Sequence, residues 1–237
     1  MEEENKILKR IHKTIFKLGS IVAILSMILI TFSIVAYFIW PYKGNTTDIE
    51  VILLVLQTDR LGGLISLDVS MLIIGPITLI TFLSIYYLVK QVDEPLAFFA
   101  LLLNIIAVVL VILCRPLIEL VTLSNQFALA TDTIEKARIL SAGEVFRTQM
   151  DGTAWTIQTA FFMIAGLINN SLMLKTAYFK KRTAWTGIVI SAIGLPFFLP
   201  GIGLIFLFFN TIGSIPWLIF VAFDLYKIYK TVSMHKK

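Results

Sequence analysis

Charged residues are scarce in this chain. Only 15% of its 237 residues are Asp, Glu, Lys or Arg, whereas about a quarter of the residues in soluble domains are charged. Hydrophobic residues make up 58% of the chain, and the mean hydropathy is +0.89. This composition excludes an ordinary soluble globular protein and predicts an integral membrane protein. Apolar segments take up most of the length, so we expect a single membrane domain over residues 1–237.

Cysteine and histidine are also rare. Cys114 is the only cysteine, which excludes an intramolecular disulfide and a multi-cysteine metal site. His12 and His235 lie in the terminal tails, so an intramembrane histidine metal site or a histidine-assisted nucleophile has no candidate residues. The sequence lacks a Walker-type phosphate loop and a dinucleotide-binding glycine pattern. We therefore predict no cofactor and no bound metal, and we favour a protein that is not an enzyme.

The clearest hydrophobic stretch covers residues 96–114, in which Asn104 is the only strongly polar side chain. At about 1.5 Å per residue, a helix of this length crosses a hydrocarbon core of about 30 Å. The stretch ends at Arg115 and Pro116. This pattern indicates a transmembrane helix that meets charged residues at one membrane boundary.

The whole chain is predicted to be all-α, with six transmembrane helices in one bundle. The predicted spans are residues 18–40, 61–89, 96–122, 152–178, 183–199 and 203–229. We place the break between the last two spans at Pro200 and Gly201, with residues 210–214 as the alternative. The first span follows a basic segment, as the apolar core of a signal peptide does. It is longer than a signal core of about 7–15 residues, so we expect a retained anchor.

A polar stretch, residues 131–151, separates the third and fourth predicted spans. Apolar residues such as Ile134 and Ile139 recur there at helical spacing among charged ones, which predicts an amphipathic surface helix. Asp132 is the expected N-cap of this helix, with Glu135 three residues further on.

Basic residues are distributed unevenly over the predicted loops. Fourteen Lys and Arg residues fall on the side that holds both termini, and six fall on the other side. By the positive-inside rule, both termini are cytoplasmic and the protein is a multi-pass plasma-membrane protein. The formal charge of +5 is thus explained by topology, and we predict no nucleic-acid partner.

Several polar residues fall within or beside the predicted spans at a similar depth. Asp68 and Gln158 each lie about seven residues from the outer end of a span, hence roughly 10 Å deep. The others lie near the outer boundary, and Arg115 is the expected partner of Asp68. The predicted ligand-binding residues are Asp68, Arg115, Glu119, Asp151, Trp155 and Gln158.

Two interpretations of these residues stay open at this stage. Ionisable groups within a membrane are costly and often mark a functional site, so the group is predicted to line an outward-facing polar pocket. Alternatively, Arg115 pairs with Asp68 or Glu119 only to hold two helices together, or it extends to the lipid headgroups.

The second half of the chain carries five short patterns. They are GTAW at 152–155, GLINNSLM at 166–173, TAWTGI at 183–188, the glycine-proline run at 194–203, and Trp217 together with the basic end LYKIYK at 225–230. With these patterns the chain resembles the bacterial and archaeal membrane family catalogued as domain of unknown function 4386. The resemblance covers residues 15–230 in layout and is specific from residue 152 onward. It implies a six-helix membrane domain and supplies no catalytic residues.

The favoured function is a non-enzymatic binding or transporter-like module for a small amphiphile, lipid or ion. One alternative is an intramembrane enzyme in which Asp68 and Glu119 act as an acid-base pair. Another is a structural or accessory subunit that packs on a membrane protein partner or on a second copy of itself. The lipid bilayer is the expected surrounding in each case.

Overall fold

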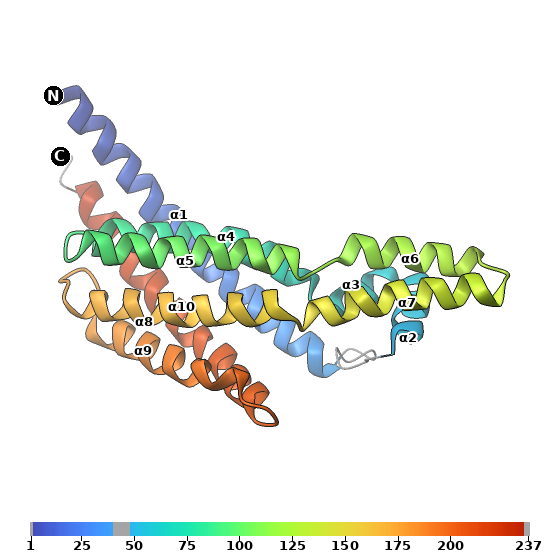
Figure 1. Cartoon of the computed structure of the whole chain (residues 1–237). Coiled ribbons are helices and arrows are strands. Elements are labelled where there is room, and N and C mark those ends of the chain that lie inside the picture. Colours follow the sequence, from blue (N-terminus) through green and yellow to red (C-terminus); the bar gives the residue numbers. More distant parts are fainter. Residues whose placement is uncertain (1, 40–47, 235–237) are drawn as a thin grey trace. The chain divides into compact units, whose positions relative to one another are not determined.

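The computed structural model describes residues 2–39 and 48–234, with side chains for 13–36 and 48–232. This described part is helical throughout and contains no strand (Figure 1). Trp40, the predicted end of the first span, lies outside the described residues. The helices are α1 (Glu2–Ile39), α2 (Ile49–Thr58), α3 (Arg60–Ser66), α4 (Val69–Val89), α5 (Glu94–Leu113), α6 (Leu117–Leu129), α7 (Thr133–Met150), α8 (Thr153–Leu174), α9 (Lys181–Gly194), the 3₁₀ helix η1 (Leu195–Phe198) and α10 (Gly203–Met234).

Among the residues that the structure describes, five helical segments are long and apolar enough to cross a membrane. They are Lys13–Ala36, Val69–Val89, Glu94–Leu129, Thr133–Leu174 and Gly203–Val232. These segments are compatible with a multi-pass membrane protein, as the composition predicts. The number of six spans stays a prediction.

Two predicted spans are interrupted in the structure. The span predicted at 61–89 is divided into α3 and α4, and Asp68 lies between them with a φ of 60°. The span predicted at 96–122 is divided into α5 and α6 at Cys114–Pro116. Pro116 explains the second interruption because it has no N–H to continue the helical hydrogen bonds. Each of these two predicted spans therefore consists of two helices and not of one.

The segment predicted as a fifth span forms the short helix α9 and the 3₁₀ turn η1. A helix of 14 residues is about 21 Å long, so α9 alone is shorter than a hydrocarbon core. The chain then turns before α10, and Gly201 in this turn has a φ of +82°, a conformation that favours glycine. The alternative break at 210–214 is wrong, because α10 runs through those residues.

The chain groups into two compact units. Unit 1 comprises Met1–Ile30, Ile74–Ala107 and Thr159–Lys237, and unit 2 comprises Thr31–Ile73 and Val108–Gln158. Helices α1, α4, α5 and α8 contribute residues to both units. The single domain expected from the sequence stays a prediction.

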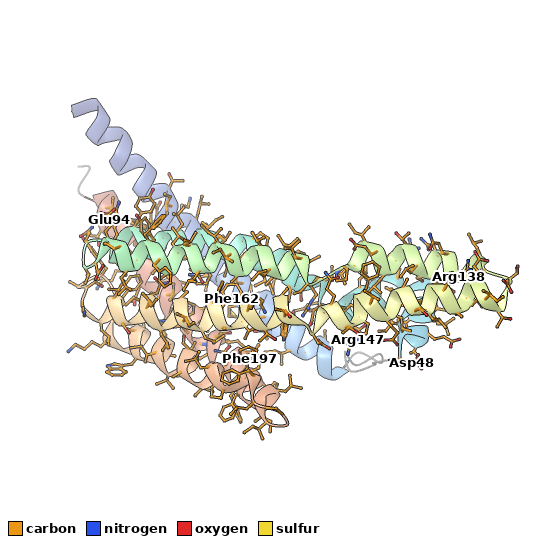
Figure 2. The ribbon with its side chains drawn as sticks, viewed as in Figure 1. Asp48, Glu94, Arg138, Arg147, Phe162 and Phe197 are labelled. Carbon is orange, nitrogen blue, oxygen red and sulfur yellow. The ribbon has the colours of Figure 1, made fainter. Side chains whose placement is uncertain are left out.

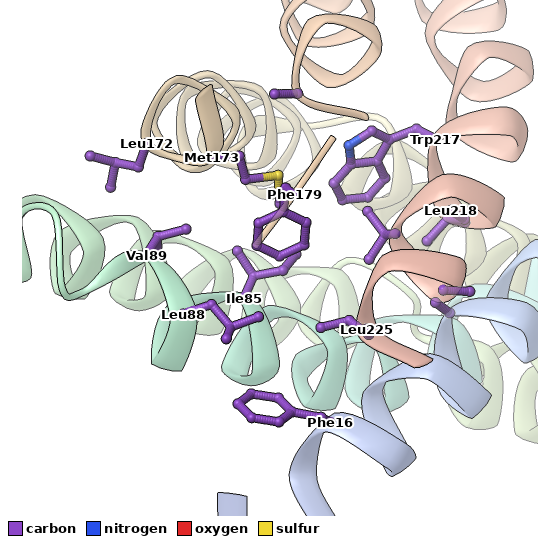
Figure 3. Close-up of a cluster of buried hydrophobic side chains, with 14 of the residues drawn as sticks. Phe16, Ile85, Leu88, Val89, Leu172, Met173, Phe179, Trp217, Leu218 and Leu225 are labelled. Carbon is purple, nitrogen blue, oxygen red and sulfur yellow. The ribbon is translucent and has the colours of Figure 1, made fainter. Parts of the chain in front are cut away.

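Unit 1 has a hydrophobic core to which α1, α4, α8 and α10 all contribute. Figure 3 shows Phe16, Ile85, Met173 and Leu225 among its buried side chains. The helices also join through hydroxyl groups that donate to backbone carbonyls. Ser20 donates to the carbonyl of Ala222 at 2.8 Å, as small polar residues do in membrane helix contacts.

The contact between α1 and α4 requires a glycine. A Cβ atom at Gly19 would lie 2.1 Å from the hydroxyl oxygen of Ser84, so any larger residue would push the helices apart. The hydroxyl of Thr81 donates to the carbonyl of Gly19 at 3.1 Å. The absence of a side chain at residue 19 therefore permits both the close approach and the hydrogen bonds.

Four basic segments of unit 1 lie at the same end of it. The start of α1, the turn before α5, the loop before α9 and the end of α10 meet there, on the left of Figure 1. Lys13 Nζ lies 5.5 Å from the ring centre of Tyr229, and the hydroxyl of Tyr178 lies 3.2 Å from Gln91 Oε1. These are the segments that the charge distribution predicts to share one side of the membrane.

The N-terminus of α9 is capped by a residue of α10. The buried carboxylate of Asp224 accepts hydrogen bonds from the backbone N–H of Lys180 at 3.1 Å and from the hydroxyl of Thr183 at 2.7 Å. Lys180, the residue before α9, supplies no side-chain cap. A negative charge at this position also interacts favourably with the helix dipole.

Unit 2 contains α2, α3, α6 and α7 around a second hydrophobic core, which includes Leu53, Leu120 and Ile139. The hydroxyl of Ser124 donates to the carbonyl of Leu53 at 2.7 Å and joins α6 to α2. Asp132 accepts from the N–H of Ile134, so the predicted N-cap of α7 is confirmed.

The outer face of α7 is charged. Glu135, Lys136 and Arg138 are exposed, and Figure 2 shows Arg138 and Arg147 on this helix. A helix is therefore present where the amphipathic helix was expected. Its position at a membrane surface stays a prediction.

We predict that Asp224→Ala lowers the free energy of unfolding by about 2–3 kcal/mol, because the buried hydroxyl of Thr183 and the part-buried N–H of Lys180 lose their acceptor. Equilibrium unfolding in mixed micelles measures this change. The matched control is Asp93→Ala, which removes an exposed carboxylate that accepts from the N–H of Leu96 at 3.0 Å. An equal loss in both variants would contradict a special role for the buried cap.

Candidate functional site

Arg115 lies at the break between α5 and α6, within unit 2, and its side chain is 4% exposed. Its Nη1 donates to the carbonyl oxygen of Cys114 at 3.3 Å and to that of Met150 at 3.0 Å. The last carbonyls of a helix have no partner within the helix. The guanidinium therefore supplies donors to carbonyl groups at the end of α5 and at the end of α7.

A second hydrogen bond joins the end of α7 to the end of α5, and here the donor lies on α7. The side-chain amide of Gln149, on α7, donates to the carbonyl oxygen of Leu113 at 2.8 Å. The break between α7 and α8 lies at Asp151 and Gly152. Each break thus receives a hydrogen bond from a side chain of the other, and the two breaks are held together.

The other edge of the Arg115 guanidinium has few partners. Nη2 lies 3.6 Å from Asp68 Oδ2, and Nε is buried with no hydrogen-bond partner. The guanidinium carbon lies 4.5 Å from the ring centre of Trp155. This arrangement combines a cation, an aromatic ring and one carboxylate, and it leaves donors of the cation unused.

Asp68 reaches Arg115 from the junction between α3 and α4. Its φ of 60° is in the left-handed region, which Asp tolerates better than most residues other than glycine. Its N–H donates to the carbonyl of Ile65 at 3.1 Å, and its own carbonyl accepts from Met71 at 2.9 Å. Because Asp68 lies between two helices, counting residues from a helix end does not give its depth, and the estimate of roughly 10 Å no longer applies.

Three further residues were predicted for this site. Asp151 forms an exposed ion pair with Arg147, one turn earlier along the chain. Gln158 is 4% exposed and lies on α8, within unit 2. Glu119 is exposed on α6, next to the highly exposed Ile118, and takes no part in the contacts of Arg115 described above. The structure therefore brings together Asp68, Arg115 and Trp155 most directly.

Some members of the site were not predicted from the sequence. The carbonyl oxygens of Cys114 and Met150 are acceptors of Arg115, and Gln149 is the reciprocal donor. Pro116 and Gly152 were signals for the two breaks. Which break pairs with which depends on tertiary structure and has no sequence signal of its own.

Comparison with known proteins gives no assignment for this site. No protein-family model, no curated protein and no solved structure matches the chain. Within the described residues, no group of three or more His, Cys, Asp or Glu side chains is arranged to hold a metal ion.

We predict that Asp68→Gly is more stable than Asp68→Ala by about 1 kcal/mol, because alanine resists the left-handed conformation and glycine adopts it freely. Both variants remove the carboxylate, so the comparison isolates the backbone. Equilibrium unfolding of the two purified variants measures the difference. Equal stability, or a more stable alanine variant, would contradict the backbone assigned to Asp68.

Proposed function

We propose that this chain is a non-enzymatic, multi-pass plasma-membrane protein whose Arg115 cluster binds a small amphiphile, lipid or ion. The membrane part is supported by the five apolar helical segments. The binding part rests on one observation, which is that Nε of the buried Arg115 guanidinium has no hydrogen-bond partner and Nη2 has only the 3.6 Å contact with Asp68. A buried charge of this kind is costly and is typical of a ligand site.

The proposed topology has both termini in the cytoplasm. The basic segments that meet at one end of unit 1 support this orientation. The segments Glu94–Leu129 and Thr133–Leu174 have 36 and 42 residues, whose helical lengths of about 54 and 63 Å exceed a core of about 30 Å. Their breaks at Pro116 and Gly152 fit helices that leave the hydrocarbon there, so that α6 and α7 continue outside the membrane.

Membership of the family with domain of unknown function 4386 is part of this proposal. The patterns from residue 152 onward support it. Membership would add a six-helix membrane domain and no specific activity.

The two alternative functions have less support. A carboxylate acid-base pair needs Glu119 beside Asp68, and Glu119 is exposed on α6. An accessory subunit would use the apolar residues that α10 exposes, such as Leu204 and Phe209, to contact a partner. Lipid covers such residues equally well, so they do not favour a partner over the bilayer.

The topology is tested with single cysteines in a Cys114→Ala background, since Cys114 is the only cysteine in the chain. We expect a membrane-impermeant maleimide to label Glu135→Cys on intact cells and to label Lys230→Cys only after permeabilisation. Both positions are exposed. Labelling of Lys230→Cys on intact cells would reverse the proposed orientation.

Ligand binding is tested by native mass spectrometry of protein purified in detergent, with identification of whatever co-purifies. We expect wild type to retain a defined ligand and Arg115→Gln to lose it at unchanged helicity, because glutamine can still donate to a carbonyl but carries no charge. The matched control, Arg138→Gln, removes an exposed arginine of α7 and should keep the ligand. A folded Arg115→Gln protein that retains the ligand, or an empty wild type, would leave Arg115 with a structural role only.

A further inference from the structure

The donors of Arg115 divide into a used and an unused set. A guanidinium has five N–H groups, and the contacts of Nη1 with Cys114 and Met150 account for the two on that nitrogen. Nε has no partner, and Nη2 lies 3.6 Å from Asp68, which is longer than a charge-assisted hydrogen bond of about 2.7–2.9 Å. Nε and Nη2 lie side by side on one edge, which matches two oxygens of a carboxylate or phosphate.

This edge is held in a fixed orientation. Nη1 is anchored to two backbone carbonyls, and the plane of the guanidinium is covered by the ring of Trp155. A binding group that is already positioned loses less entropy when a ligand arrives. The free edge is thus prepared to accept one pair of oxygens.

Asp68 and Arg115 differ in their access to water. The side chain of Asp68 is 47% exposed, whereas that of Arg115 is 4% exposed. If the pair separates, water can solvate the carboxylate, but the guanidinium has no such replacement. Asp68 is therefore the partner that an incoming anion can replace. The next carboxylate, Asp151, is already paired with Arg147.

We infer that the Nε and Nη2 edge of Arg115 binds the oxyanion of an anionic ligand, a carboxylate or phosphate group, and that Asp68 competes with it for this edge. The inference rests on the proposed function and specifies the ligand chemistry at that site. It assigns opposite roles to two residues that a purely structural ion pair would make equivalent. Removing the charge of Asp68 strengthens binding, and removing the side-on edge of Arg115 weakens it.

The oxyanion can belong to a lipid headgroup or to a soluble anion. The test therefore uses three probes on protein in a neutral maltoside detergent: phosphatidylglycerol, phosphatidylcholine and inorganic phosphate. Native mass spectrometry measures the lipids, and calorimetry measures phosphate. Stronger binding of phosphatidylglycerol than of phosphatidylcholine identifies a lipid headgroup, whereas saturable binding of phosphate identifies a soluble anion.

The decisive variants are Asp68→Asn and Arg115→Lys. Asparagine tolerates the left-handed backbone and keeps the size of Asp68, so we expect Asp68→Asn to bind the anionic probe about tenfold more tightly, since a like charge opposes the ligand. Lysine keeps the charge but has no planar edge, so we expect binding about tenfold weaker than in wild type. The control Asp132→Asn removes an exposed carboxylate of unit 2 and should leave binding unchanged.

The outcomes separate the two proposals. Equal or weaker binding by Asp68→Asn overturns the competition inferred here, while a ligand that is still lost in Arg115→Gln keeps the proposed function. If no probe binds to wild type or to Asp68→Asn, the oxyanion assignment is wrong. If Arg115→Lys does not fold, the comparison of wild type, Asp68→Asn and Asp132→Asn still decides the inference.

Discussion

A helix that is interrupted in or beside a membrane must still satisfy the carbonyl groups at the interruption, because lipid offers no hydrogen bonds. In unit 2 this requirement is met by two side chains. Arg115 donates to carbonyls at the ends of α5 and α7, and Gln149 donates back to the end of α5. Asp68 at the α3–α4 junction and Trp155 at the start of α8 both contact the guanidinium of Arg115. The residue that joins the ends of α5 and α7 therefore also joins α8 and the α3–α4 junction to them.

The helices of unit 1 are joined by residues of other types. Its contacts depend on glycine and on hydroxyl groups that donate to backbone carbonyls, as Ser20 and Thr81 do. Gly19 allows α1 and α4 to approach closely enough for these bonds. Buried charge is used sparingly there, with Asp224 at the start of α9 as the example. Unit 1 is held by close packing and by hydroxyl-to-carbonyl hydrogen bonds, whereas unit 2 also contains the ion pair of Arg115 and Asp68.

Composition and hydropathy were sufficient to predict helices and most segment ends, and the long apolar helices that they predict are compatible with a membrane protein. The pairing of Asp68 with Arg115 was also predictable, as an unpaired charge near a membrane needs a partner. The interruption at Asp68 was not, since a left-handed aspartate has no sequence signal. Glu119 was grouped with Arg115 because it follows one turn later, but helical spacing does not say which face packs inward. The other face of α6, with Leu117 and Leu120, is the buried one.

The cap of α9 has a consequence for how the protein is made. Lys180 and Asp224 are 44 residues apart, so the ribosome completes α9 well before its capping carboxylate emerges. A helix of 14 residues is marginal alone in water. During synthesis the N-terminus of α9 therefore lacks its capping carboxylate until Asp224 of α10 has been made. A chain whose synthesis stops before Asp224 would therefore contain the residues of α9 without the carboxylate that caps the helix.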